Sequence, residues 1–413
     1  SVIPAGAKGV RVAIVGGRVV TNDSAGIIEG GTVLIEDGRV TAVGKDIAVP
    51  AGFKQIDAHG KWVTPGIVSA FSRLGIEEVE LEDSANDAGI KESDIAGAAD
   101  VASAFDPHSI PLIVNRFAGI ARAMIAPDGG PSPIAGIGAA ADLSGEPTSL
   151  NRDCAFLYLE MGDEGVSREG HSRMVLWPFL ESALADAKTF PARFMATREG
   201  AVLTRTEAQA LRSAVRGTMP VLMHVESAPD IRRALDLRTR HPSLHLILIG
   251  ASEAWLVAKE LAAAKVPVIV DPFANLPREF ETLGARLDNA MLLKKAGVQV
   301  AISQSPGDQD AHQIRLLMQH AGNAVANGMS WADAFAAITS VPADIFCLDG
   351  AGRLKPGALA DVVVWDGDPL EAESAATAVF IAGDPVPMQS RQTELRDRYL
   401  DLKGAVEHPF QYR

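Results

Sequence analysis

Charged and polar side chains end several apolar, strand-like segments of this sequence, and their chemistry could serve a function. The stretch "GKWVTPGIVSAFSRLG", Gly60 to Gly75, carries Arg73 directly after an apolar run. Another run, "PVLMHVES", ends in His224 and Glu226. An arginine binds anions through a rigid, permanently charged fork of donors, and a histidine exchanges protons near neutral pH. The combination predicts a polar pocket that either holds a small anionic molecule or acts on it by acid–base chemistry.

The segments that carry these residues alternate between strand and helix patterns. Apolar strands are expected at "IVSAF", "RAMIA", "AFLYLEM", "PVLMHV", "LHLILIG", "VPVIVD" and "VQVAIS", with helical patterns such as "APDIRRALDLRTRH" between them. The glycine-rich "SPIAGIGAAADLSG" is a candidate for an eighth strand. Near-continuous apolar strands separated by helices indicate a parallel sheet covered by helices. We therefore predict an α/β fold with a closed, TIM-like (β/α)8 barrel, and an open doubly wound sheet is the alternative.

The two ends of the chain have a different pattern. Short alternating strands with glycine turns fill residues 10–63, and they return in "GRLKPGALADVVVWDGDPL" and "TAVFIAGDPV". We expect the first group to form a small antiparallel sheet and the two groups to share one composite β-sandwich. The predicted domains are residues 1–64 plus 350–390 for the sandwich, 65–349 for the barrel and 391–413 for a C-terminal helical tail.

Composition narrows the classes of partner. The 413 residues are 47% hydrophobic and 22% charged, with a formal net charge of −14. Nucleic acid and anionic membranes are excluded as partners, because no cluster of Lys and Arg is dense enough to follow phosphates. Cys154 and Cys347 lie among apolar neighbours and are expected to be buried thiols. The chain begins with Ser rather than Met, which we interpret as trimming of a soluble protein of either the cytoplasm or the periplasm.

Longer matches give a resemblance to a known family. "VTPGIVSAFSRLG" resembles the signature that ends the first barrel strand in the amidohydrolase superfamily. "PVLMHVES", "LHLILIGASEAW", "VQVAISQS" and "GRLKPGALADVVVWDGDPL" are similar to later strand ends and to the returning sheet strand of its imidazolonepropionase-like branch. The resemblance extends from about Val10 to Leu370. It implies a barrel with a composite β-sandwich and, in active members, metal-assisted hydrolysis of C–N bonds.

Most metal-ligand positions that the resemblance implies hold unsuitable residues. Active members have His-x-His on the first strand, where this chain has Phe71 and Arg73. The bridging lysine after the fourth strand has no counterpart, and the sixth-strand histidine is replaced by Gly250. At the end of the eighth strand, where active members have an aspartate, this chain has Ser303, Gln304 and Ser305.

Of the implied ligands only His224, at the fifth-strand position, remains. A catalytic zinc needs about three protein ligands. We therefore expect no metal and no cofactor.

The expected pocket leaves three functions open. His224 is the candidate catalytic residue, as a general base, and the residues expected to bind substrate are Arg73, Glu160, Glu226, Asp271, Gln304 and Ser305. His312, with Asp308 or Asp310, is a second candidate at the barrel mouth.

The first hypothesis is a pseudoenzyme, or a protein that binds a small anionic amide or peptide-like ligand. The second is a hydrolase of cyclic amides or dipeptides, in which Arg73 stabilises an oxyanion. The third is a silent subunit paired with an active paralogue. We expect either a homodimer or such a pairing.

Overall fold

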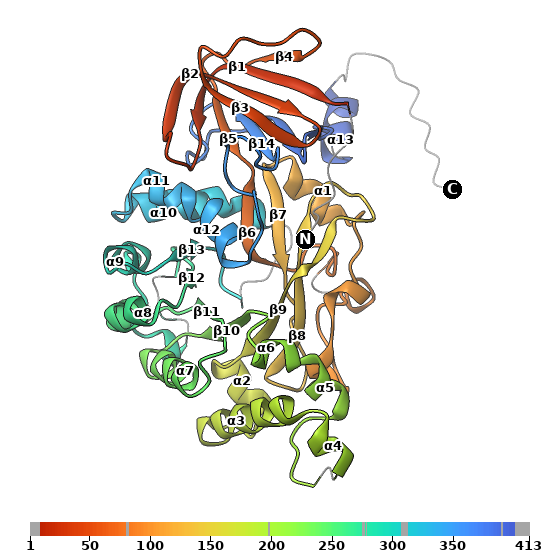
Figure 1. Cartoon of the computed structure of the whole chain (residues 1–413), viewed down its shortest axis with the longest axis vertical. Coiled ribbons are helices and arrows are strands. Elements are labelled where there is room, and N and C mark those ends of the chain that lie inside the picture. The colour runs from red at the N-terminus through yellow and green to blue at the C-terminus, as the bar shows by residue number, and fades with distance from the viewer. Residues whose placement is uncertain are drawn as a thin grey trace.

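Two eight-stranded sheets organise the chain (Figure 1). The computed structural model describes residues 9–79, 82–196, 199–274, 277, 279–306, 313–389 and 391–400. The C-terminal residues 401–413 of the predicted tail, and the candidates His312, Asp308 and Asp310, lie outside the described residues.

The larger part of the chain surrounds the barrel-like sheet, in which all seven strands expected from the sequence are confirmed. Its order is β13-β12-β11-β10-β9-β8-β7-β6. The strands are β6 (Ile67–Ser72), β7 (Ile120–Ile125), β8 (Ile134–Asp142), β9 (Leu150–Glu160), β10 (Val221–Val225), β11 (Leu246–Gly250), β12 (Val268–Val270) and β13 (Val300–Ile302). Every residue of β6, β7, β10 and β11 is buried, as expected for strands with side chains packed on both faces.

The glycine-rich strand β8 departs from the predicted parallel barrel. It runs antiparallel to both β7 and β9. The connections on its two sides, residues 126–133 and 143–149, contain no helix and are too short for the crossover that a parallel strand needs. Glycine is required at Gly138, because a Cβ there would lie 2.2 Å from the Phe156 ring. The expectation of eight parallel strands is therefore wrong at this strand.

A backbone segment after the helix α11 (Trp331–Ala336) nearly closes the sheet between β13 and β6. The Ile302 amide donates to the carbonyl of Ala337, and the Val68 amide donates to the carbonyl of Ile338, both at 2.9 Å. Residues 337–338 thus bridge the two edge strands, which would otherwise expose unpaired backbone groups.

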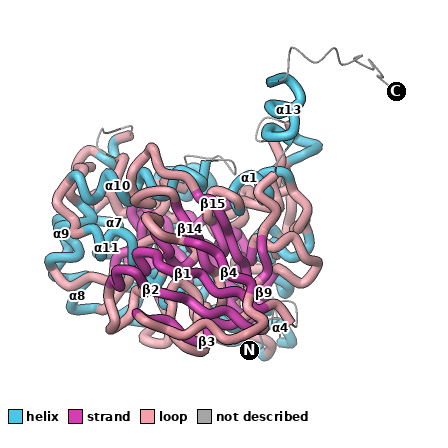
Figure 2. Tube along the Cα trace, turned by 90° about the horizontal axis from the view of Figure 1, so that it is seen from above, coloured by secondary structure: helices cyan, strands magenta, loops and turns pink. Residues whose placement is uncertain are grey.

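The second sheet combines both ends of the chain. Its order is β16-β15-β14-β5-β1-β2-β3, with β4 paired to β1. The strands are β1 (Arg11–Val20), β2 (Ile27–Glu36), β3 (Arg39–Lys45), β4 (Lys54–Asp57), β5 (Trp62–Pro65), β14 (Val362–Trp365), β15 (Ala376–Ile381) and β16 (Asp384–Pro385). The join is the antiparallel pair β5–β14, and Figure 2 looks onto this sheet from above.

The strand directions in this sheet differ in part from the sequence expectation. The antiparallel order expected for residues 10–63 is confirmed for β1, β2 and β3 and is wrong for β4 and β5, which lie parallel to β1. The two layers of a sandwich and the predicted domain boundaries stay predictions.

A buried ion pair fixes the composite sheet to the barrel-like sheet. Arg122 on β7 donates to both carboxylate oxygens of Asp361, at 2.6 and 3.3 Å. Asp361 precedes β14 and also accepts from the Ala382 amide at 2.8 Å. The aspartate of the "KPGALADVVVW" segment therefore holds the two sheets together.

Helices cover the outside of the barrel-like sheet, and α7 to α11 lie along one side of it (Figure 1). Helix α7 begins at its cap Ser227, whose hydroxyl accepts from the Asp230 amide. The remaining helices are α1 (Ile110–Arg116), α2 (Asp163–Arg168), α3 (Arg173–Thr189), α4 (Ala192–Ala196), α5 (Arg205–Ala210), α6 (Arg212–Val215), α7 (Ala228–Arg240), α8 (Ala258–Ala264), α9 (Asn289–Lys295), α10 (Leu317–Ala326), α12 (Ser340–Ile345) and α13 (Arg391–Leu400). Among the described helices, none is long and apolar enough to cross a membrane.

Cys347 corrects one expectation about the interior. It is exposed and has a left-handed backbone with φ of 59°, just after α12. An apolar neighbourhood in sequence therefore did not mean burial, since Cys347 is exposed although its neighbours Phe346 and Leu348 are buried.

Candidate functional site at the carboxyl ends of the barrel strands

A buried ionic network surrounds His224, which lies on β10. Its Nδ1 lies 2.7 Å from Glu160 Oε1 at the end of β9, and its Nε2 lies 2.9 Å from Glu226 Oε1 just after β10. Both carboxylates have further donors. Tyr158 donates to Glu160 at 3.1 Å, and the amide and hydroxyl of Ser252 donate to Glu226 at 2.9 and 2.6 Å. The structure thus brings together three of the residues expected from the sequence.

The carboxylates hold the proton on His224. Burial alone would lower the pKa of His224, but the charges and hydrogen bonds of Glu160 and Glu226 outweigh it and raise that pKa well above its ordinary range. Burial would raise the pKa of Glu160, and the charge and hydrogen bond of His224 instead lower it. Because each ring nitrogen of His224 faces a carboxylate oxygen, the geometry favours an imidazolium that donates from both nitrogens.

Gly250, at the end of β11, leaves room for this network. A Cβ at Gly250 would lie 2.3 Å from Glu226 Oε1 and 2.8 Å from His224 Cδ2. Its φ of +85° is also a conformation that residues with a side chain rarely adopt. The space where a sixth-strand histidine would project is filled by the carboxylate of Glu226.

Arg73, just after β6, forms a separate ion pair. Its side chain is buried, and it donates to Asp128 Oδ1 at 2.6 Å and to the Pro306 carbonyl at 3.5 Å. Asp128 follows β7 and is half exposed. The Phe71 ring packs against Tyr158, with centroids 5.5 Å apart. Arg73 is thus neutralised by Asp128, a residue that was not among those expected in the pocket.

Asp271 and Ser305 form a third group at the ends of β12 and β13. Asp271 accepts from the Ser305 hydroxyl at 3.0 Å and from its amide at 3.2 Å. Its other oxygen lies 3.0 Å from Nδ1 of His320, a buried residue of α10. Burial would raise the pKa of Asp271, and the bond to His320 helps to lower it. Gln304 is half-buried beside this group.

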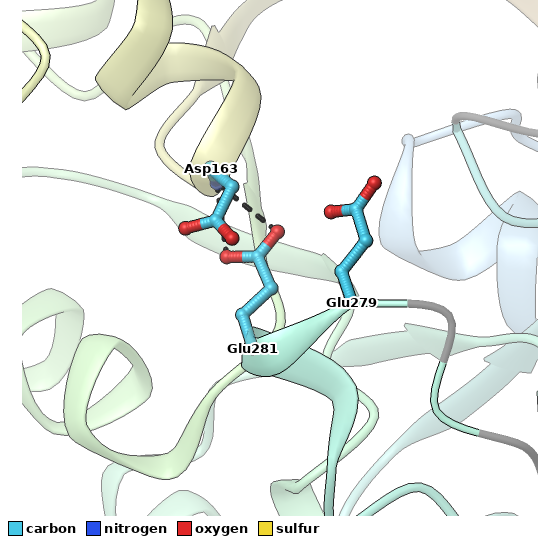
Figure 3. Close-up of side chains that lie close together, drawn as sticks. All are labelled: Asp163, Glu279 and Glu281. Atoms are coloured by element: carbon cyan, nitrogen blue, oxygen red, sulfur yellow. Dashed lines mark hydrogen bonds between the residues drawn. The ribbon is translucent and has the colours of Figure 1, made fainter.

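Three carboxylates gather on the loop after β12 and the start of α2 (Figure 3). Asp163, Glu279 and Glu281 have oxygens within 4.8 Å of one another. Both oxygens of Glu281 accept from the Asp163 amide, and Arg173 donates to one of them at 3.0 Å. Burial raises the pKa of Glu281 to about 7. Glu281 therefore fastens the loop after β12 to the helices α2 and α3.

A cavity of about 390 Å³ opens beside Asp128. Its walls come from the loop after β6, the β7–β8 connection and α2. Arg168 on α2 donates to Glu164 at 3.1 Å and to the Asp128 carbonyl at 3.2 Å. Lys91 pairs with Asp83 on the loop after β6. Side chains of both charges therefore line this cavity.

Comparisons with known proteins agree with these features. The sequence profile described as the amidohydrolase family matches residues 208–388. The amidohydrolase tasK of Hapsidospora irregularis is 24% identical over 86% of this chain, which spans 40% of the length of that relative. The imidazolonepropionase of Paracoccus denitrificans is 25% identical over 83% of this chain and 89% of its own. Residues 208–388 match the amidohydrolase family, and most of the chain is similar to members of the amidohydrolase superfamily.

A solved structure has the same overall fold as this chain. An amidohydrolase from Thermotoga maritima MSB8 superposes with a TM-score of 0.82 at 24% identity, over 92% of this chain and all of that one. The likeness confirms a TIM-barrel architecture, modified here by the antiparallel strand β8.

The residues at the superfamily's metal positions do not fit a metal. Phe71 offers no ligand atom, and Arg73 brings a positive charge to the same strand end. His224 has both nitrogens bound to carboxylates, and a side chain at Gly250 would collide with Glu226. We derive no chemical step that passes through a metal.

Sequence reasoning missed several groups of this site. Asp128 follows the strand β7. Arg73 was selected because it is a charged residue after an apolar strand, and the same criterion would have found Asp128. Glu281 lies on a one-turn 3-10 helix between β12 and α9, and His320 lies within the helical pattern of α10, so neither follows a strand end.

Proposed function

We propose that this protein is a non-metallo member of the amidohydrolase superfamily that binds a small molecule. The observation that carries the proposal is the clamping of His224 between Glu160 and Glu226, at 2.7 and 2.9 Å. An imidazolium with both N–H groups engaged has no lone pair for a metal or for a substrate proton. The same arrangement weighs against the hypothesis that His224 is a general base.

A hydrolase of C–N bonds in cyclic amides or dipeptides is the second candidate. It is favoured by two relatives, an amidohydrolase and an imidazolonepropionase. It is also favoured by the Asp271–His320 pair, in which a carboxylate orients a buried imidazole near the strand ends. An imidazole held in this way can work as an acid–base group.

Metal content and hydrolysis, measured on one preparation, separate the two candidates. The protein is purified without chelators, its metals are counted, and cyclic amides and dipeptides are supplied with and without Zn²⁺ or Mn²⁺. We expect less than one metal per chain and no turnover above background. Turnover that disappears in His320→Gln, which breaks the Asp271–His320 pair, but persists in His245→Gln, which changes an exposed histidine, would favour the hydrolase.

The assembly is part of the same proposal. We propose a homodimer, with a silent partnership beside an active paralogue as the alternative. Sedimentation equilibrium of the purified chain distinguishes them, because the second requires a monomer that dimerises only with the paralogue.

A further inference from the structure

The cavity beside Asp128 is separate from the closed His224 network and carries charges of both signs. Its volume of about 390 Å³ is at the small end of the range of about 300–1,000 Å³ for ligand pockets. Acidic Asp83, Asp128 and Glu164 line it together with basic Lys91 and Arg168. A small ligand with two opposite charges therefore has complementary groups on the walls of one cavity.

Asp128 presents an acceptor to the cavity. Its Oδ1 accepts from Arg73, whereas its Oδ2 has no hydrogen-bond partner among the described residues. Oδ2 would lie 3.9 Å from a Cβ on Gly89, which lines the same cavity. The hydrogen bond from Arg73 to Oδ1 holds the Asp128 carboxylate in one orientation. Oδ2 can therefore accept from a donor such as an ammonium group.

Lys91 supplies the opposite charge. It pairs with Asp83, and the two side chains are 78% and 82% exposed. An exposed pair of this kind contributes at most about 1 kcal/mol, and salt screens it. A ligand carboxylate can therefore replace Asp83 on Lys91 at little cost.

We infer that this cavity binds a small zwitterion of the amino-acid or short-peptide class, with the ligand's ammonium group at Asp128 and its carboxylate at Lys91. The inference deepens the proposed function and rests on it, since it gives the small-molecule ligand a place and a chemical class.

The test is calorimetric titration of the full chain with glycylglycine, acetate and methylammonium. We expect glycylglycine to bind and each single-charge probe to bind at least about tenfold more weakly, which is the effect of losing about 1.4 kcal/mol. Lys91→Gln and Asp128→Asn should each weaken glycylglycine about tenfold. Lys45→Gln, an exposed lysine of β3, is the matched control and should change nothing.

Three results would overturn the site: no binding of glycylglycine, equal affinity in wild type and Lys91→Gln, or equal affinity for glycylglycine and methylammonium. Asp128→Asn also removes the partner of Arg73, so its thermal unfolding is measured, and Lys91→Gln decides the question if Asp128→Asn unfolds. One bound metal per chain together with hydrolysis would contradict the proposed function. Binding of glycylglycine that depends on Lys91 would still support the zwitterion site.

Discussion

The carboxyl ends of the barrel strands form two unlike halves. Around β9 to β11, His224, Glu160 and Glu226 are buried, and His224 is hydrogen-bonded to both carboxylates. Around β6 and β7, the loops leave a cavity whose charged groups are partly or mostly exposed. The first half has the features of internal structure, and the second has those of a place for a ligand. In this chain the strand ends around His224, where the resemblance implies metal ligands, are thus part of the protein core.

The largest effect is expected when a side chain is placed at Gly250, beside the buried His224 network. Gly250→His should destabilise the protein by about 4 kcal/mol, because left-handed strain and overpacking against Glu226 add up. Gly357→His is the matched control: Gly357 also has φ of +85°, but a Cβ at this position would have nothing within 4 Å. The control should lose only about 1–2 kcal/mol of strain. Equal losses in denaturant unfolding would show that the site is not filled.

Removing one of the two carboxylate partners of His224 should cause the next largest loss of stability. Glu226→Ala leaves a buried imidazolium with one partner, and we expect a loss of about 3 kcal/mol in the free energy of unfolding. Glu260→Ala removes an acid from an exposed pair with Arg232 and should cost no more than about 0.5 kcal/mol. A loss for Glu226→Ala as small as that of the control would mean that the network is not structural.

The pH dependence of stability tests the buried acid Glu281. Its folded pKa of about 7 lies above its ordinary value of 4.5, so its stabilising contribution is complete below about pH 4.5 and is lost as the pH rises to about 7. His224 acts in the same direction, since its pKa is also raised in the folded state.

Between pH 5 and pH 8, wild type should therefore lose about 1–2 kcal/mol more than Glu281→Gln. Urea unfolding at both pH values measures this difference. Parallel pH profiles for the two proteins would contradict the assignment to Glu281.

The smallest effect is expected in the open half. Asp83→Asn breaks the exposed pair with Lys91 and should change stability by less than about 0.5 kcal/mol. Thermal unfolding at low and moderate salt checks this result. A loss of more than about 1 kcal/mol would make the cavity wall part of the structure, like the His224 network.

Local patterns predicted the strands well and their directions less well. Apolar runs located β6, β7 and β9 to β13, because burial on both faces leaves a continuous signal. The direction of β8 depends on the length of its connections, and the parallel pairing of β4 and β5 with β1 depends on long-range packing.

The site was predictable to the same extent. Position at a strand end selected Glu160, His224 and Glu226, which the structure brings into contact. The partners of Arg73 and Asp271 depend on how loops and α10 fold back over the strands, and Asp128 and His320 supply them. The hydrophobic periodicity of one segment cannot predict contacts between residues that are far apart in the sequence.

The central claim is that His224 is a doubly donating imidazolium and part of the structure. The most direct measurement is ¹⁵N NMR of histidine-labelled protein near pH 7.5, with His224→Gln to assign the resonance. We predict that both ring nitrogens of His224 carry protons and that added Zn²⁺ leaves their shifts unchanged. A neutral ring with one bare nitrogen, or a shift on addition of Zn²⁺, would contradict the account.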